Sequence, residues 1–482
     1  MKPQTSTIQT ELDKAHSFSA DLHVESKQLA RVVEELLEKL YEHSKPLRQQ
    51  RAKHLPQLDV LVLNLLKAAD SSGKAMALSR SPSSYRGNVS YRILVKHHLD
   101  TLIEMRWLHL HKGYRLPQTS RVSRVTLRKP LVDWLRKLDD ITPDIDRSAP
   151  TQVLTLKDEK KNPIEITEEL HSEAEKLSAG THKINEHLEK TNIDLFLDDY
   201  DLEDLQIRMS EKAKGDPFAH AYLDLTKRYL RRIFNNGSLQ QGGRFYDGWW
   251  QSIPSEYRQY ISLNGDYVVE LDYSSIHIHL LYSLIQQTCH MEDHYVFGKL
   301  SKQWRPITKK MVNILINAKS RESAIKAAKN QGLFDNGFPD GISDISDYIK
   351  EIYFHHDDIS TFFSTGYGVR LQFLDSQIAE AVMLRMLPEP YLPVHDSFIV
   401  RSGQQEWLEQ VMNEEFQAAT GIEAGIKSTV IELTDARKSV IQELIEDELN
   451  PYSQRLYRWR LKYQYKYFIR GVTSNDVPIL KA

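Results

Sequence analysis

Two short apolar segments that each end in a carboxylate at a chain reversal constrain this sequence most. Val268–Asp272 predicts a strand that ends in Asp272, and the pattern from Ile276 onward predicts a helix directly after this corner. Residues 392–400, Leu-Pro-Val-His-Asp-Ser-Phe-Ile-Val, predict two strands joined by a turn with Asp396 at its tip. Carboxylates on neighbouring strands can share two divalent cations, so the pattern predicts a phosphoryl-transfer site.

A basic helix is predicted between the two corners. Arg305 and Lys309 lie one turn apart on one helix face, and Asn313 and Asn317 continue that stripe at four-residue intervals. Aligned Arg and Lys side chains suit a triphosphate, with Asn317 near its sugar or base. An isolated Asp at a strand end is usually a cap or turn residue, so the combination with this helix is what favours catalysis.

Four ordered blocks between residues 240 and 405 resemble a known family. Asp272-Tyr-Ser-Ser-Ile is similar to motif A of family A DNA polymerases, and His395-Asp396-Ser is similar to motif C. In the single-subunit RNA polymerases of phages and mitochondria motif C is also His-Asp-Ser, and the Arg305/Lys309 helix resembles their motif B. Residues 243–258, with Gly-Arg, Gln-Ser-Ile-Pro and Arg, look like the stretch before motif A. The order of the blocks supplies the specificity.

The resemblance implies an α+β fold with a right-hand palm and reduced fingers, since only 124 residues separate Asp272 from Asp396. These two aspartates would hold two Mg²⁺ ions, with Mn²⁺ as a substitute, and the Tyr273 carbonyl would add a ligand. His395 would brace the turn or approach the primer end. The implied nucleotide-binding residues are Tyr273, His277, Arg305, Lys309, Lys310, Asn313 and Asn317. Arg244, Gln251, Arg258 and Gln372 are the implied contacts to template or primer.

Two departures from the family leave the choice of sugar open. His277 stands where the DNA polymerases place a Glu as a gate against ribose, and Asn317-Ala318 stand where the relatives have an aromatic residue and Gly. An alternative register gives Lys310 the triphosphate role. The implied partners are therefore a DNA template and primer or RNA, with dNTP or NTP. Glu270 is a third carboxylate or a salt-bridge partner, because it shares the strand face of Asp272.

Residues 55–137 resemble a winged helix-turn-helix domain. Helices are predicted before two alternating segments, 107–111 and 122–127, which would form the wing. The whole chain has a net charge of −3, but residues 86–137 contain twelve Lys and Arg against three acids. DNA contacts are expected from Arg92 and Lys96 on the helix and from Lys112 and Arg115 on the wing. The alternative is a protein-protein adaptor with a solvated basic face.

The remaining domain boundaries follow from changes in pattern. We expect a helical segment over 1–54 and a linker over 138–165. A thumb-like helical region is expected over 166–240, and its last helix leads to residues 231–234. Palm and fingers are expected over 241–450, and a basic aromatic tail over 451–482. The tail either binds single-stranded nucleic acid or packs on the palm. Nothing before residue 240 resembles a proofreading exonuclease.

Composition excludes several other classes. The single cysteine excludes an intramolecular disulfide and a multi-cysteine zinc module, and no Walker or Rossmann glycine pattern occurs. The histidines at 290, 294, 355 and 356 lack the spacing of a zinc site and are read as polar turns. No signal peptide or membrane-spanning apolar run is found, so we expect a cytoplasmic protein.

These patterns predict a template-dependent nucleotidyltransferase. A DNA polymerase without an exonuclease, suited to replication or repair of a phage, plasmid or mobile element, is favoured over a single-subunit RNA polymerase or primase. The alternative from another class is a catalytically inactive DNA-binding replication initiator or regulator, and His277 with Asn317 is compatible with it.

Overall fold

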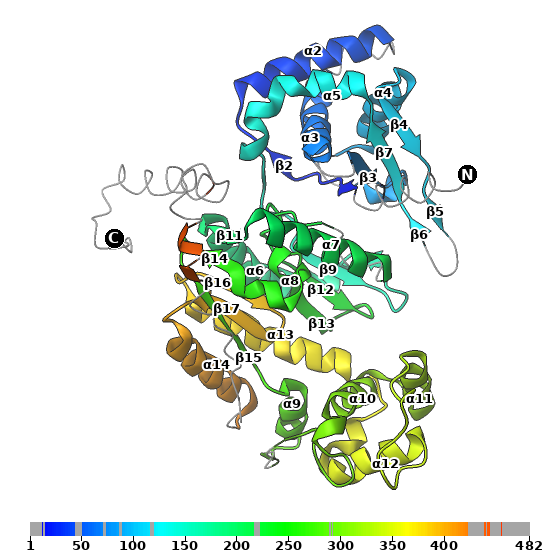
Figure 1. The fold of residues 1–482 in the computed structure, drawn as a ribbon, viewed down its shortest axis with the longest axis vertical. Coiled ribbons are helices and arrows are strands. Elements are labelled where there is room, and N and C mark those ends of the chain that lie inside the picture. Colours follow the sequence, from blue (N-terminus) through cyan, green and yellow to red (C-terminus); the bar gives the residue numbers. More distant parts are fainter. Residues whose placement is uncertain are drawn as a thin grey trace. The chain divides into compact units, whose positions relative to one another are not determined.

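The computed structural model divides the chain into two compact units (Figure 1). The first comprises residues 1–150, 197–227 and 252–254, and the second comprises 151–196, 228–251 and 255–482. The structure describes residues 12, 15–43, 51–70, 74–85, 89–115, 120–215, 222–288, 291, 293–422, 438–439, 441–443 and 455. Within these residues no helix is both long enough and apolar enough to cross a membrane.

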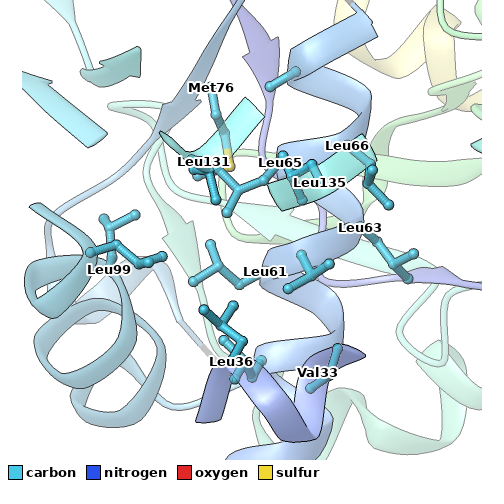
Figure 2. Packing of buried hydrophobic residues seen from close by; sticks show 14 of the residues in the cluster. Val33, Leu36, Leu61, Leu63, Leu65, Leu66, Met76, Leu99, Leu131 and Leu135 are labelled. Carbon is cyan, nitrogen blue, oxygen red and sulfur yellow. The ribbon is translucent and has the colours of Figure 1, made fainter. Parts of the chain in front are cut away.

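A leucine-rich helical core supports the first unit. Its helices are α2 (Lys27–His43), α3 (Arg51–Asp70), the π-helix η3 (Arg92–Leu99) that continues into α4 (Asp100–Glu104), α5 (Lys129–Leu135), and α7 (Asp199–Gly215). The apolar spacing predicted for α2 is confirmed, because Leu29, Val32, Val33, Leu36, Leu37 and Leu40 are all buried. Figure 2 shows Val33 and Leu36 of α2 with Leu61, Leu63, Leu65 and Leu66 of α3 in this core.

A four-stranded sheet lies beside these helices in the order β1-β3-β7-β4. Its strands are β1 (His16–Ser17), β3 (Ala75–Leu78), β7 (Ser123–Leu127) and β4 (Leu108–His111). The antiparallel β4–β7 pair, which the alternating pattern predicts, is extended by β5 (Tyr114–Arg115) and β6 (Ser120–Arg121) into a projecting ribbon (Figure 1). Gly113 permits close approach of the two segments of the ribbon, because a Cβ at this position would lie 2.4 Å from the Arg121 carbonyl oxygen.

The second unit contains a four-stranded sheet in the order β10-β9-β12-β13. It consists of β10 (Pro163–Ile164), β9 (Leu154–Lys157), β12 (Arg231–Asn235) and β13 (Ser238–Tyr246), and helices α6 (His171–Lys190) and α13 (Gly368–Met386) pack on it. Residues 231–234, within the region expected to be helical, form a strand in which alternate residues are buried. Within 138–165, β9 pairs with β12 in parallel, and the first boundary between the two units falls at residues 150–151.

A three-stranded antiparallel sheet forms the centre of the second unit, in the order β15-β17-β16. Its strands are β15 (Val268–Asp272), β17 (Ser397–Arg401) and β16 (Tyr391–Val394). Helices α9 (Ile276–Leu284) and α14 (Gln405–Thr420) follow β15 and β17 along the chain. Figure 1 shows α10 (Arg305–Asn317), α11 (Arg321–Asn330) and α12 (Ile345–His355) gathered beside one end of α13.

Short elements complete the description. They are β2 (Leu22–His23) paired with β8 (Asp146–Arg147), β11 (Ile193–Leu195) paired with β14 (Ile261–Leu263), α8 (Trp249–Ser252), and the 3₁₀ helices η2 (Pro82–Ser84), η4 (Arg136–Asp144), η5 (Glu168–Leu170), η6 (Ser255–Tyr260), η7 (Lys302–Trp304) and η8 (Asp357–Phe362). Helices and several small sheets together make a mixed α and β fold. The tail over 451–482 lies outside the described residues except for Arg455, which pairs with the buried Asp194 at 2.6 Å.

Candidate active site

The structure brings the two predicted aspartate corners together. In the register of β15 and β17, Asp272 lies opposite Ser397, the residue that follows Asp396. The Tyr273 backbone N–H donates to the Asp396 carbonyl oxygen at 3.3 Å, which ties the two chain reversals to each other. His395 has a φ of 61° and so makes the tight turn that exposes Asp396 between β16 and β17. Both secondary-structure predictions for these segments are confirmed.

Like charges surround Asp272. Burial, together with the neighbouring Asp396 and Glu270, raises the pKa of this carboxyl to about 7, against the opposite effect of Lys309 and Arg258. No ion pair of Asp272 or Asp396 is found among the residues that the structure describes. A cation bound here would therefore relieve a repulsion that the protein itself leaves in place.

Glu270 makes a salt bridge, which is one of the two roles that the sequence left open for it. Arg258 donates to Glu270 Oε1, and the Ser397 hydroxyl donates to the same oxygen at 2.7 Å. These bonds hold Glu270 on the sheet face that Asp272 shares. Arg258, which is expected to contact nucleic acid, is held by this ion pair.

The donors at this corner fit a hard divalent cation. Asp272 and Asp396 supply carboxylate oxygens, and the Tyr273 carbonyl follows Asp272 directly in the chain. Magnesium is usually held by one or two carboxylates, with water and substrate phosphates filling its other positions. No group of three or more His, Cys, Asp or Glu suited to a metal occurs in the described part of the chain, so further ligands would come from water or substrate.

Helix α10 carries the basic residues predicted for the triphosphate. Lys309, Lys310, Asn313 and Asn317 are exposed, and the influence of Lys309 on Asp272 shows that it lies within electrostatic range of the corner. Arg305 is the first residue of α10, and its Nε donates to Asp293 Oδ2 at 2.7 Å.

Asn317 lies against the beginning of α13. Its Nδ2 donates to the Asn313 carbonyl oxygen at 2.8 Å, and a Cβ on Gly368 would lie 2.1 Å from its Oδ1. Gly368 therefore permits the close approach of α13 to the last turn of α10.

A second network joins β13, α9 and α13. The Asp375 carboxylate, 2% exposed, accepts from Arg244 Nε at 3.1 Å and from Arg244 NH2, and it also contacts His277 Nε2 at 2.8 Å. Burial alone would lower the pKa of Arg244, but its bonds to Asp375 and the charge of Asp396 raise it. Asp375 lies three residues after Gln372 on α13. The signal for its role is an acid on an otherwise apolar helix face.

Two of the residues expected to contact template or primer are also bonded internally. Gln251 Nε2 donates to the carbonyl oxygens of Phe245 and Pro393 at 3.1 and 3.0 Å, and two nitrogens of Arg244 are held by Asp375. These bonds connect β13 and α8 to the β16 strand. Gln372 is half-buried on α13.

His395 packs against Tyr246, with ring centroids 5.2 Å apart. Burial lowers the pKa of His395, and the nearby Arg244 lowers it further, so the imidazole is neutral near pH 7. Its Nδ1 is buried and has no hydrogen-bond partner among the described residues.

The basic residues predicted in the first unit have exposed side chains. Arg92 and Lys96 lie on η3, where Lys96 pairs with Asp100 at 3.2 Å, and Lys112 lies at the base of the ribbon. The side chain of Arg115 lies outside the described part of the structure, although its backbone belongs to β5.

Comparisons with known proteins add little. No protein-family model matches the chain, and no curated protein sequence matches it. One solved structure that it resembles is the POL domain of Pol1 from M. smegmatis in complex with a DNA primer-template and dNTP. The two are 11% identical with a TM-score of 0.30, and the alignment covers 88% of this chain and 68% of that chain. A likeness this low supports no conclusion about this chain.

Proposed function

We propose that the chain is a template-dependent nucleotidyltransferase that transfers a nucleotide from a nucleoside triphosphate to a primer end. The observation that supports this most is the pair of carboxylates, Asp272 at the end of β15 and Asp396 in the turn before β17, with no ion-pair partner in the described residues. Lys309 on α10 supplies the nearby positive charge that a triphosphate needs. The ordered motifs named above, from the residues around Arg244 to those around Asp396, favour a family A type polymerase.

In this proposal Asp272 and Asp396 hold two Mg²⁺ ions. When bound, the ions would neutralise the attacking and leaving oxygens of an in-line displacement. Lys309 and Arg305 bind the triphosphate, and Lys310 is the alternative partner in the second register. The Arg258–Glu270–Ser397 bonds hold β15 and β17 in register, which keeps Asp272 beside the turn that carries Asp396.

We further propose that the first unit docks on duplex DNA as a winged helix-turn-helix module. Support comes from the projecting β5–β6 ribbon and from the exposed side chains of Arg92, Lys96 and Lys112. Replacing Arg92 and Lys96 with Ala should weaken duplex binding about uniformly across sequences and lower its salt dependence. An unchanged salt dependence would favour the adaptor alternative.

Extension of a labelled primer on a DNA template tests the catalytic proposal. Wild-type protein, Asp396→Ala and Asp335→Ala should be compared with Mg²⁺ or Mn²⁺ and with dNTPs or NTPs. Asp335 is a matched control because it is an aspartate in the loop after α11, away from the β15–β17 corner. We expect extension by wild type and the control, with a loss of about a thousandfold or more in Asp396→Ala. Tight DNA binding without extension under any condition would favour the inactive initiator or regulator.

A further inference from the structure

Arg305 at the beginning of α10 is held by a short loop that precedes the helix. Asp293 Oδ2 accepts from Arg305 Nε at 2.7 Å, while Asp293 Oδ1 accepts from the Tyr295 backbone N–H at 2.9 Å. One carboxylate thus holds both the loop backbone and the guanidinium. Since each oxygen has its own partner, rotation of the Asp293 side chain would break two bonds.

Tyr295 covers the face of the same guanidinium. The guanidinium carbon of Arg305 lies 5.3 Å from the centroid of the Tyr295 ring, and the ring itself is 3% exposed. A buried ring is a rigid support, and stacking on it restricts the rotation of the arginine. The Tyr295 hydroxyl also interacts with Ser275, the left-handed residue that directly precedes α9. The loop therefore connects Arg305 to the corner that follows Asp272.

The two terminal nitrogens of Arg305 are left open. Nε is its only nitrogen with a hydrogen-bond partner among the residues described by the structure, and the side chain is 42% exposed. A guanidinium binds a phosphate group best through two parallel N–H donors, and the NH1/NH2 edge is one such pair. Because Asp293 binds Nε, it leaves the edge formed by the two terminal nitrogens free.

We infer that Asp293 and Tyr295 are positioning residues for polyphosphate recognition, because they hold Arg305 with its NH1/NH2 edge presented to the triphosphate of the incoming nucleotide. This inference rests on the proposed function. Neither residue contacts the reacting atoms; both act through Arg305. A free arginine would lose side-chain entropy on binding, and the loop removes most of that cost beforehand.

A simple charge effect predicts the opposite result. If Asp293 only neutralised Arg305, its removal would strengthen the binding of a triphosphate. Positioning through the hydrogen bonds predicts that Asp293→Ala weakens binding and that Asp293→Asn, which keeps one of the two acceptor oxygens, weakens it less.

Calorimetric titration of the full chain with Mg²⁺-dATP and with inorganic tripolyphosphate tests the inference, together with kcat and KM for primer extension. The variants are Asp293→Ala, Asp293→Asn, Arg305→Ala and the double variant, with Asp347→Ala as the matched control. Asp347 is also a half-exposed aspartate paired with a basic side chain, Lys350, but it lies on α12. We expect Asp293→Ala to weaken binding and raise KM about tenfold, with kcat within about twofold of wild type.

The double variant identifies the route of the effect. If Asp293 acts through Arg305, the double variant binds no more weakly than Arg305→Ala alone. Additive losses, unchanged binding in Asp293→Ala or tighter binding in it would each overturn the inference while leaving the proposed function intact. A wild-type protein that binds neither probe would overturn both.

Discussion

Two groups of charged side chains in the second unit differ in how the fold pairs them. Arg232, 0% exposed, donates to the Gly243 carbonyl oxygen at 2.8 Å, to Glu380 at 2.6 Å and to the Ser376 hydroxyl at 3.1 Å. Its guanidinium also lies between the rings of Phe234 and Phe245. Asp272 and Asp396, by contrast, are like charges with no ion pair within the described residues.

The contrast separates structural charges from functional ones. Each guanidinium nitrogen of Arg232 has a partner, so this network ties β12 and β13 to α13 and needs no ligand. The ionised aspartate pair lowers the stability of the folded protein, and in our proposal a bound cation removes this cost. Unpaired like charges of this kind are typical of functional sites, whereas the charges of Arg232 and Glu380 are paired inside the protein.

The largest effect on stability is expected from Arg232→Ala. The substitution leaves the Glu380 carboxylate buried without its partner, which should lower the free energy of unfolding by about 3–5 kcal/mol. Urea unfolding of the metal-free protein measures this loss. A decrease below about 1 kcal/mol would show that the network is not structural.

A change of opposite sign is expected at the aspartate pair. Because the folded protein resists ionisation of Asp272, the unfolded chain loses this proton near its ordinary pKa of 3.8 and the folded chain only near 7. Wild-type stability therefore falls as pH rises from about 4 to 7. Asp272→Asn should be more stable than wild type by about 2–4 kcal/mol at pH 8 without metal, and equal to it at pH 3. A lower stability at pH 8 would contradict the account.

The first unit contains a titratable group, His98, that is buried in its neutral form. His98 is 1% exposed, its Nε2 has no partner among the described residues, and burial together with nearby His54 and His97 lowers its pKa to about 3. Below pH 6.5 His98 is protonated in the unfolded chain but stays neutral in the folded chain, so the free energy of unfolding decreases as pH falls. Between pH 6.5 and 5 the loss from this residue should be about 2 kcal/mol. His98→Gln should flatten the pH dependence of urea unfolding over this range, and an unchanged slope would contradict the assignment.

The smallest effect is expected at an exposed ion pair. Lys190 and Glu186 lie four residues apart on α6, 2.9 Å from each other, with side chains that are 49% and 67% exposed. Lys190→Ala should change the free energy of unfolding by less than about 0.5 kcal/mol. A larger loss would show that pairing alone, without burial, stabilises this fold.

Local patterns predicted the parts of the site that neighbouring residues determine. The strand β15, the β16–β17 hairpin and the helix α10 follow from short-range periodicity and turn chemistry, and so does the buried face of α2. That Asp272 and Asp396 share one sheet could be expected from the resemblance of their motifs. The structure adds the register, in which Asp272 lies opposite Ser397, the residue that follows Asp396.

Long-range contacts explain what the sequence did not predict. The strand β12 was expected to be part of a helical region, because only two of its residues are buried and so short a pattern does not distinguish a strand from a helix. Its pairing with β9 and β13 selects the extended form. The bonds of Arg244 and Arg258 to Asp375 and Glu270 span 131 and 12 residues, and no local signal pairs them. The hydrogen bond between Asp293 and Arg305 likewise depends on how the loop before α10 folds back on this helix.

Direct binding of Mn²⁺ tests the central claim, that the Asp272–Asp396 corner is a metal-dependent catalytic centre. Electron paramagnetic resonance can measure bound Mn²⁺ in wild type, Asp272→Asn, Asp396→Asn and the control Asp335→Asn, without DNA or nucleotide. We predict saturable binding that strengthens as pH rises through about 7 in wild type and the control, and that is lost in both corner variants. Binding that persists unchanged in both corner variants would contradict the claim.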